Sequence, residues 1–337
     1  MARTCHGASG DPFHPQDGCV GSNGPTDPRP RGRSLIHDEE RIVIGEDEVW
    51  RWPGGARAAA ALTFDVDGES SVLFDAPDAA RRLSVMSHQA YGPLVGVPRI
   101  LSILERHGVR ATFFVPGFTA DRYPDVVRAI ADGGHEIAHH GYLHESVSTL
   151  TPEREEQVLI HGIEALERTS GQRPIGWRGP MWEVNHETPA LLAKHGFRYD
   201  SSLMDADRPY LLRTAEDDSA PTLVEIPVHW GLDDGEQYAW LPGIWEGDGI
   251  ASPRKLLEMW TLEFEAVVAD GGCFVPTIHP CFSGRPSRAA AVDELVRMIC
   301  VTDGVWVATG SEIANHVDST GSPSRYHMPI TLPEDDG

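Results

Sequence analysis

Short apolar runs alternate with amphipathic helical patterns over most of the chain. The runs that predict strands span residues 59–64, 109–115, 223–228, 273–278 and 305–308. The intervening stretches that place apolar side chains on one helical face span residues 98–107, 151–169, 188–195, 253–267 and 292–299. Strands separated by helices predict a parallel sheet. About seven such units favour one α/β barrel over separate domains.

Two terminal segments lie outside this alternating pattern. Residues 1–40 are dominated by Gly, Pro, Ser and Asp, and we expect a disordered extension because little there can offset the entropy cost of ordering. Residues 319–337 lack periodicity and are predicted to form an irregular tail. The barrel is therefore expected to occupy residues 41–318.

The charge balance argues against several classes of partner. The chain has 28 Lys plus Arg against 51 Asp plus Glu, a formal net charge of −23, which repels nucleic acid and anionic membrane surfaces. No apolar stretch begins the chain, and no run reaches the roughly 18 apolar residues of a membrane span. Five cysteines without a CxxC pair do not form a disulfide framework. A cytoplasmic location is the expectation.

Two carboxylates follow directly after the first predicted strand, in the segment TFDVDGE. Asp65 and Asp67 can point the same way once Gly68 lets the chain turn. Side by side they repel each other unless a cation lies between them or an arginine neutralises one. A solvated acidic turn is the alternative interpretation of this motif taken alone.

Four histidines lie within ten residues in the segment HEIAHHGYLH. Two histidines at positions i and i+4 can share a metal ion through their imidazole nitrogens. Both His135/His139 and His140/His144 satisfy this spacing, so the spacing alone leaves both pairs open.

Two further reactive residues lie in other motifs of the chain. Arg178 occurs in WRGPMW, and His279 directly follows the predicted strand 273–278. A surface turn and a structural hydrogen bond are the respective alternatives. Because the C-terminal ends of barrel strands build active sites, reactive residues after several strands favour a catalytic interpretation.

Taken together, the segments TFDVDGE, GHEIAHHGYLHE, WRGPMW, FRYDSSL and IHPCFSGRPSR resemble the polysaccharide deacetylase (NodB-homology) superfamily. The resemblance extends from about residue 58 to 314 and is greatest to the branch that contains a peptidoglycan deacetylase, cyclic imide hydrolases and a cofactor-independent allantoinase. It implies a deformed (β/α) barrel, often assembled as a homotetramer. It also implies a metal-dependent hydrolase of C–N amide-type bonds.

The resemblance also implies a metal site. The ligands carried over from the family are Asp67, His140 and His144, so that His139 is left as a neighbour. Mixed imidazole and carboxylate ligands favour a divalent ion, with zinc as the expected one.

The catalytic roles come from the same resemblance. Asp65 matches the general base, His279 the general acid and Arg178 the arginine that orients the base. Asp200, in FRYDSSL, lies near the family position that holds an acidic partner for the histidine.

The expected substrate is a small cyclic imide, ureide or acylated amine, with N-acetylglucosamine or peptidoglycan deacetylation as the alternative. A small pocket could be lined by loop residues, although ordinary loop packing explains the aromatic ones equally well. These candidates are His88, Tyr91, Trp182, Tyr210 and Trp230, with Asp233 and Asp234 nearby in the sequence.

Three other functions are less favoured by the residues present. The complete set of ligand-type residues argues against a metal-free allantoinase-like enzyme. A glycoside hydrolase does not need the histidine cluster. A binding protein without activity is expected to have lost Asp65 or His279, and both are present.

Overall fold

The computed structural model describes residues 50–246, 249–322, 324–330 and 332 of the chain. The extension predicted for residues 1–40 lies outside this part. None of the described helices is both long and apolar enough to cross a lipid bilayer.

The described residues form an α/β fold with two sheets. A three-stranded sheet has the order β11-β1-β9, and a nine-stranded sheet has the order β10-β2-β3-β4-β5-β6-β8-β7-β12. All strand pairs are parallel except β7 with β8. The strands are β1 (Ala58–Ala60), β2 (Thr63–Asp65), β3 (Thr112–Val115), β4 (Glu136–His139), β5 (Gly176–Trp177), β6 (Tyr199–Asp200), β7 (Tyr210–Arg213), β8 (Thr222–Glu225), β9 (Cys273–Phe274), β10 (Thr277–Ile278), β11 (Val305–Val307) and β12 (Ser324–Arg325).

Two predicted strands are each divided in the structure. Residues 59–64 were expected to form one strand but belong to β1 and β2, and residues 273–278 belong to β9 and β10. The division arises because the first segment changes partner: Ala308 N donates to Ala60 O at 3.0 Å, whereas Thr112 N donates to Leu62 O at 3.0 Å. Each divided segment thus contributes one strand to the three-stranded sheet and one strand to the nine-stranded sheet.

A single bridge completes the ring of strand pairings. After β8 the chain returns to β10, where Asp233 pairs in parallel with Thr277 and Asp234 N donates to Thr277 O at 3.1 Å. A regular ladder therefore runs from β10 to β8, and the last connection is reduced to one point of contact. This arrangement is the deformed (β/α) barrel that was expected.

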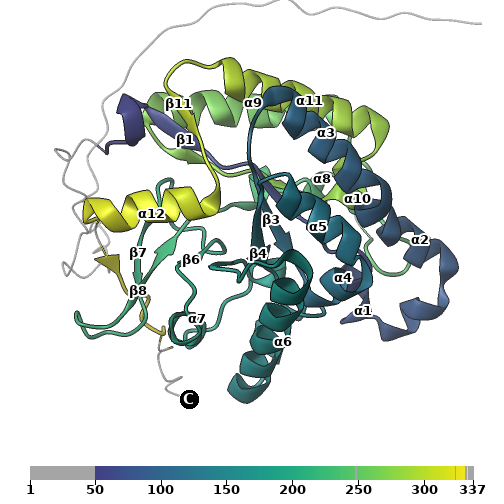
Figure 1. The fold of residues 1–337 in the computed structure, drawn as a ribbon, viewed down its shortest axis with the longest axis horizontal. Helices are drawn as coiled ribbons and strands as arrows, with labels where there is room; N and C mark the ends of the chain where they lie inside the picture. The colour runs from purple at the N-terminus through teal and green to yellow at the C-terminus, as the bar shows by residue number, and fades with distance from the viewer. Residues whose placement is uncertain (1–49, 247–248, 323, 331, 333–337) are drawn as a thin grey trace, which may run out of the picture. The chain divides into compact units, whose positions relative to one another are not determined.

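Helices pack around the strands (Figure 1). Neighbouring helices contact one another in the order α9, α11, α3, α5 and α6. The longer helices are α2 (Leu83–Tyr91), α3 (Val97–His107), α5 (Pro124–Asp132), α6 (Pro152–Ser170), α9 (Pro253–Asp270), α11 (Pro286–Val301) and α12 (Gly310–Thr320). The shorter helices are α1 (Ser70–Leu73), α4 (Gly117–Arg122), α7 (Thr188–Lys194), α8 (Gly235–Tyr238) and α10 (Pro280–Ser283).

Local sequence signals set the helix ends. The Thr151 and Ser252 side chains accept hydrogen bonds from the first turns of α6 and α9, as N-cap residues do. Thr309 and Glu312 form a reciprocal capping box at the start of α12. Gly108 ends α3 with φ +64°, a backbone conformation that a side chain disfavours. The predicted helices therefore appear close to their expected positions.

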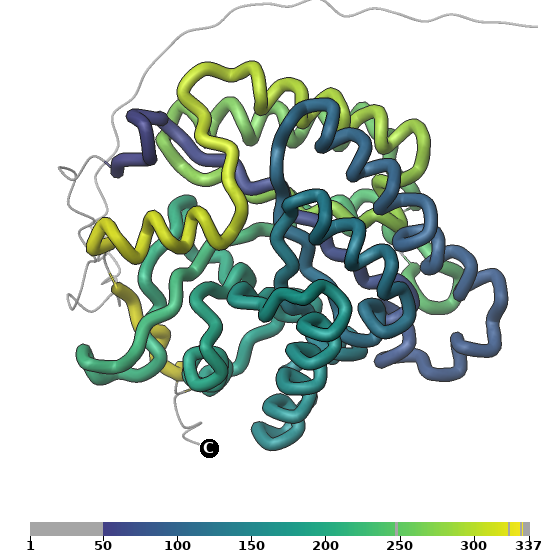
Figure 2. Tube along the Cα trace, viewed as in Figure 1, coloured from purple at the N-terminus to yellow at the C-terminus, as the bar shows by residue number. Residues whose placement is uncertain are grey.

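Segments from both ends of the described chain meet in the fold (Figure 2). Strand β1 lies between the late strands β9 and β11, and helix α12 packs against β8. The tail that was predicted to be irregular from residue 319 includes the end of α12 and the two-residue strand β12, which pairs with β7.

Candidate active site

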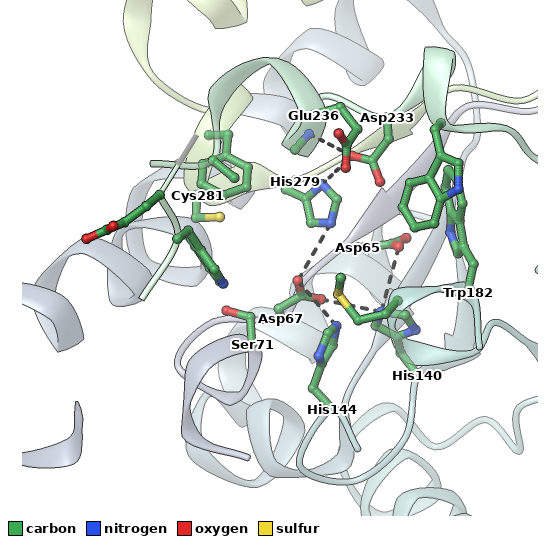
Figure 3. A pocket seen from close by; sticks show the side chains of 17 residues that line it. Asp65, Asp67, Ser71, His140, His144, Trp182, Asp233, Glu236, His279 and Cys281 are labelled. Atoms are coloured by element: carbon green, nitrogen blue, oxygen red, sulfur yellow. Dashed lines mark hydrogen bonds and ion pairs between the residues drawn. The ribbon is translucent and has the colours of Figure 1, made fainter. Parts of the chain in front are cut away.

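A cavity of about 380 Å³ lies beyond the C-terminal ends of β2, β4 and β10 (Figure 3). Its reactive side chains are Asp65, Asp67, His140, His144, Asp233 and His279. Its aromatic side chains are Trp182, Trp230, Trp245 and Phe282. The strand-end residues of TFDVDGE, of the histidine segment and of IHPCF therefore converge on one space.

The structure brings Asp67, His140 and His144 together, and all three are buried. One oxygen or nitrogen from each lies within 4.8 Å of the others. His140 Nε2 is 3.6 Å from Asp67 Oδ1, and His144 Nε2 is 3.8 Å from Asp67 Oδ2. These separations exceed hydrogen-bonding distance, so the three side chains face one another without bonding.

The chemistry of this set fits a divalent metal. Asp67 Oδ1 is buried and has no hydrogen-bond partner among the described residues, an arrangement that is costly unless a ligand contacts it. His140 Nδ1 donates to the carbonyl of Arg178 at 2.8 Å, which leaves Nε2 as the free nitrogen. Burial, aided by the adjacent His144, lowers the pKa of His140 to about 3, so the imidazole is neutral.

The loop after β4 holds His144 in an uncommon backbone conformation. Its φ is +59°, which non-glycine residues adopt infrequently. Glu145 stabilises the loop, because its carboxylate accepts from Tyr142 N at 2.9 Å and Leu143 N at 2.8 Å. Backbone strain of this kind persists where surrounding contacts enforce it, and here it directs His144 toward Asp67.

The two earlier histidines of the segment lie outside the cavity lining. His139 is fully buried, accepts from Gly141 N at 3.1 Å and donates through Nε2 to Leu159 O at 3.1 Å. His135 accepts from Ala111 N at 3.2 Å and packs edge-on against Phe113. Both imidazoles are thus engaged in structural contacts.

Arg178 holds Asp65 in place from beneath the cavity. Its side chain is completely buried, and Nη1 donates to Asp65 Oδ1 at 2.8 Å and to Thr63 and Thr277 at 3.0 and 3.1 Å. Its Nε and Nη2 donate to the carbonyl and hydroxyl of Ser201. The second oxygen of Asp65 is left on the cavity side, 3.7 Å from His140 Nε2.

His279 is oriented by a carboxylate on the opposite side of the cavity. Its Nδ1 donates to Asp234 Oδ1 at 2.7 Å, and its Nε2 lies 3.7 Å from Asp67 Oδ2. Asp233 Oδ1 is 3.5 Å from the same Nδ1. Burial opposes the charged imidazole, yet Asp233 and Asp234 outweigh it and raise the pKa of His279 well above its ordinary value.

The suggested pairing of Asp200 with His279 is wrong, because Asp234 occupies that position. Asp200 on β6 is the register partner of Glu225 on β8, and both are buried. Asp200 accepts from Ser202 Oγ at 2.6 Å, and Glu225 accepts from the backbone of Ser202 and Leu203. Burial raises the pKa of Asp200 to about 6, and burial together with Asp200 raises the pKa of Glu225 well above its ordinary value.

Only two of the five predicted pocket residues line the cavity. The rings of Trp182 and Trp230 pack at a centroid distance of 4.4 Å on its wall. Tyr210 is buried on β7 and donates to Asp205 at 2.8 Å. Tyr91 donates to Gly284 O at 3.2 Å, beneath Arg285. The ring of His88 lies 6.2 Å from that of Phe282, measured between centroids. These three side chains therefore have packing roles outside the cavity lining. The sequence pattern could not distinguish such roles from pocket lining.

Several residues of the cavity wall were not predicted from the sequence. Cys281 and Phe282 follow His279 directly, so their place in IHPCF was an available signal. Glu236, Trp245 and Glu246 come from the connection after β8, whose path back to β10 no local pattern reveals.

Comparison with known proteins identifies the family. Residues 90–199 match the family model described as polysaccharide deacetylase. The peptidoglycan deacetylase of Helicobacter pylori is 34% identical over 243 residues, covering 66% of this chain and 83% of that protein. The chain belongs to the polysaccharide deacetylase family. A peptidoglycan deacetylase-like protein of Gibberella zeae is also similar, at 29% identity over 77% of this chain and 84% of that protein.

Solved structures of polysaccharide deacetylase relatives share the fold. One, from Mycobacterium smegmatis and described as a "putative polysaccharide deacetylase", has 50% identity and a TM-score of 0.80 over 85% of this chain and 97% of that one. The PuuE allantoinase has 25% identity and a TM-score of 0.69 over 84% of this chain and 99% of that one. The chain is therefore a hydrolase of this family, acting on carbon–nitrogen bonds other than peptide bonds.

Proposed function

We propose that the chain is a metal-dependent deacetylase that removes the acyl group from an N-acetylated amino sugar. The observation that carries this proposal is the convergence of Asp67, His140 and His144 between two oriented residues, Asp65 and His279. The similarity to peptidoglycan deacetylases over most of the chain supports the substrate class.

Asp67, His140 and His144 would hold the metal, with zinc favoured by the mixed nitrogen and oxygen ligands. When bound, a divalent metal would polarise the acyl oxygen and make water more acidic. Asp65 would accept the proton of the attacking water with its cavity-side oxygen, while Arg178 fixes its orientation. Glu69, the third carboxylate of TFDVDGE, accepts from Arg122 Nε at 2.9 Å and from Tyr123 OH at 2.6 Å and does not line the cavity.

His279 would protonate the departing nitrogen. An unprotonated amine is a poor leaving group, so amide cleavage needs a positioned acid. Asp234 accepts from Nδ1 and leaves Nε2 directed toward Asp67. Asp65 and His279 thus approach the space around Asp67 from different strands, one as base and the other as acid.

A small cyclic imide or ureide is the second candidate substrate. A cavity of about 380 Å³ is near the lower end of the range for small-molecule sites. The structural likeness to an allantoinase supports the same class. The ligand-type residues retained here argue against a metal-free mechanism.

A substrate panel separates these candidates. Purified enzyme should release acetate from N-acetylglucosamine oligomers, and a chelator should abolish the release until metal is restored. Asp65→Asn and His279→Ala should each lose about 10²-fold or more in kcat while keeping the metal. Hydrolysis of succinimide-like or ureide rings without acetate release from sugars would favour the second candidate. Activity unaffected by chelation and metal removal would contradict the metal-dependent proposal.

The assembly predicted from the family resemblance is a homotetramer. Sedimentation or light scattering of the full chain measures it directly. A monomer at micromolar concentration would contradict that expectation without affecting the catalytic proposal.

A further inference from the structure

We propose that the cavity selects substrates that carry a second, positively charged amine near the scissile N-acyl group. This inference rests on the proposed function, because it places the cleaved amide between Asp65 and His279. It concerns the side of the cavity formed by Asp233, Glu236 and Glu246.

The cavity lining contains acidic groups but no arginine or lysine among the described residues. Arg178 offsets the charge of Asp65, a divalent ion would offset that of Asp67, and a protonated His279 would offset that of Asp234. Asp233 Oδ1 also lies 3.5 Å from His279 Nδ1, whereas the carboxyl groups of Glu236 and Glu246 have no basic partner among the described lining residues. The remaining field therefore favours a cation.

Asp233 provides a buried acceptor within this field. It is 7% exposed, and its Oδ1 accepts from Gly235 N at 2.6 Å. No hydrogen bond from the described residues reaches its Oδ2. In Figure 3 the carboxyl group of Asp233 is directed into the cavity near His279. This carboxylate oxygen is therefore free to accept a hydrogen bond from a ligand in the cavity.

The aromatic wall supplies a second kind of contact for a cation. Trp182 and Trp230 pack together on one side, and Trp245 contacts Phe282 edge-on at a centroid distance of 5.9 Å. Aromatic faces attract ammonium groups, and indole does so most strongly. Carboxylates combined with these rings form a site suited to an ammonium group rather than to an anion.

The two arginines that follow the IHPCF segment, Arg285 and Arg288, are directed elsewhere. Arg285 lies over the ring of Tyr91 at 3.6 Å, and Arg288 lies over Tyr238 at 4.1 Å. Neither residue lines the cavity. An anionic substituent near Glu236 and Glu246 would therefore meet carboxylates without an arginine or lysine in the described lining.

Three sugars that differ in charge test the inference by kcat/KM, and the first two form a matched pair of disaccharides. They are N-acetylglucosaminyl-glucosamine with one free amine, neutral diacetylchitobiose, and anionic N-acetylmuramic acid. Wild type should prefer them in that order. The double variant Glu236→Gln/Glu246→Gln should raise KM for the cationic sugar about two- to fivefold per charge removed, and salt should have the same effect. Glu258→Gln, an exposed glutamate on α9 outside the cavity lining, is the matched control.

The outcomes separate this inference from the proposed function. Turnover of the neutral sugar without a preference for the cationic one, or an unchanged preference in the double variant, overturns the inference and leaves the deacetylase proposal intact. If no sugar is cleaved, the amino-sugar proposal fails. The inference is then tested with N-acetyl-1,3-diaminopropane against N-propylacetamide, and equal kcat/KM for that pair overturns it.

Discussion

Arg178 shows how much of the site depends on the geometry of one side chain. Its guanidinium bonds Asp65, Thr63, Thr277 and Ser201 at once while stacked 4.0 Å from the centre of the Phe114 ring. Asp65 and Arg178 are 113 positions apart in the sequence. The orientation of the proposed base therefore depends on contacts that only the folded barrel provides.

Arg178→Lys should lower kcat about 10²-fold while leaving metal content near the wild-type value. Lysine keeps the positive charge, but its ammonium group cannot reproduce the planar guanidinium whose N–H groups bond several acceptors at once. Steady-state kinetics and elemental analysis of the same preparation measure both quantities. Near-normal kcat would mean that charge alone, and not the orientation of Asp65, is what Arg178 contributes.

Asp234→Asn should move the alkaline limb of the kcat/KM profile to lower pH. The carboxylates of Asp233 and Asp234 raise the pKa of His279, which keeps the acid form present to higher pH. Removing one of these charges lowers that pKa, so the protonated form is lost earlier as the pH rises. Asp200→Asn is the matched control and should leave the limb in place. A larger shift of the alkaline limb with Asp200→Asn than with Asp234→Asn would show that Asp200 is the partner of His279.

The reactive residues could be predicted from the sequence, whereas the residue that hydrogen-bonds His279 could not. Asp65, Asp67, His140, His144 and His279 all reach one cavity because parallel strand ends meet there. The histidine spacing alone left two pairs open, and the family resemblance selected the pair that the structure places beside Asp67. The partner of His279 could not be predicted, because it depends on the chain after β8 folding back onto β10.

At the scale of the elements, strands β6 and β8 bury two carboxyl groups opposite each other, Asp200 and Glu225. Burial and Asp200 raise the pKa of Glu225 well above its ordinary value of 4.5. The folded chain thus keeps a proton that the unfolded chain releases. This contribution to stability is complete below that ordinary value and is lost as the pH rises through the folded pKa.

Glu225→Gln should therefore gain stability relative to wild type as the pH rises. The amide matches the protonated acid in shape and cannot ionise, so the slope caused by Glu225 disappears. Urea denaturation between about pH 4.5 and pH 8 measures the difference in free energy of unfolding. A difference that stays constant or shrinks with rising pH would show that Glu225 does not keep its proton in the folded chain.

Helix α6 meets β4 where Gly162 faces His139. A Cβ added to Gly162 would lie 2.1 Å from His139 Nε2. Gly162→Ala should therefore destabilise the fold by about 1–3 kcal/mol, although the same change in an open helix stabilises it by about 1 kcal/mol. Thermal and urea unfolding of this variant, and of its combination with His139→Ala, measure the effect. Stabilisation by Gly162→Ala alone would contradict the packing described.

The element boundaries that the sequence missed share one cause. The runs 59–64 and 273–278 are continuous in apolar character, so periodicity predicts one strand in each. The structure divides them because the neighbouring strands change along their length, from β11 to β3 beside the first run and from β1 to β2 beside the second. A change of partner is a property of the whole sheet and leaves no mark in the local pattern.

At the scale of the whole molecule, one irregular closure organises the site. The bridge between Asp233 and Thr277 completes the ring of strands and also positions Asp234 beside His279. The fold class was predictable from the alternation of strands and helices, whereas this connection was not. The same connection carries Glu236 and Glu246, so barrel closure and the proposed substrate selection depend on one segment.

Metal content of purified wild type, His140→Ala and His139→Ala tests the central claim most directly. Elemental analysis should find about one divalent ion per wild-type chain, almost none in His140→Ala, and near wild-type occupancy in folded His139→Ala. The reason is that His140 Nε2 faces Asp67, whereas both nitrogens of His139 are bonded within the protein. Equal occupancy in wild type and His140→Ala, or loss of the ion only in His139→Ala, would contradict the assignment.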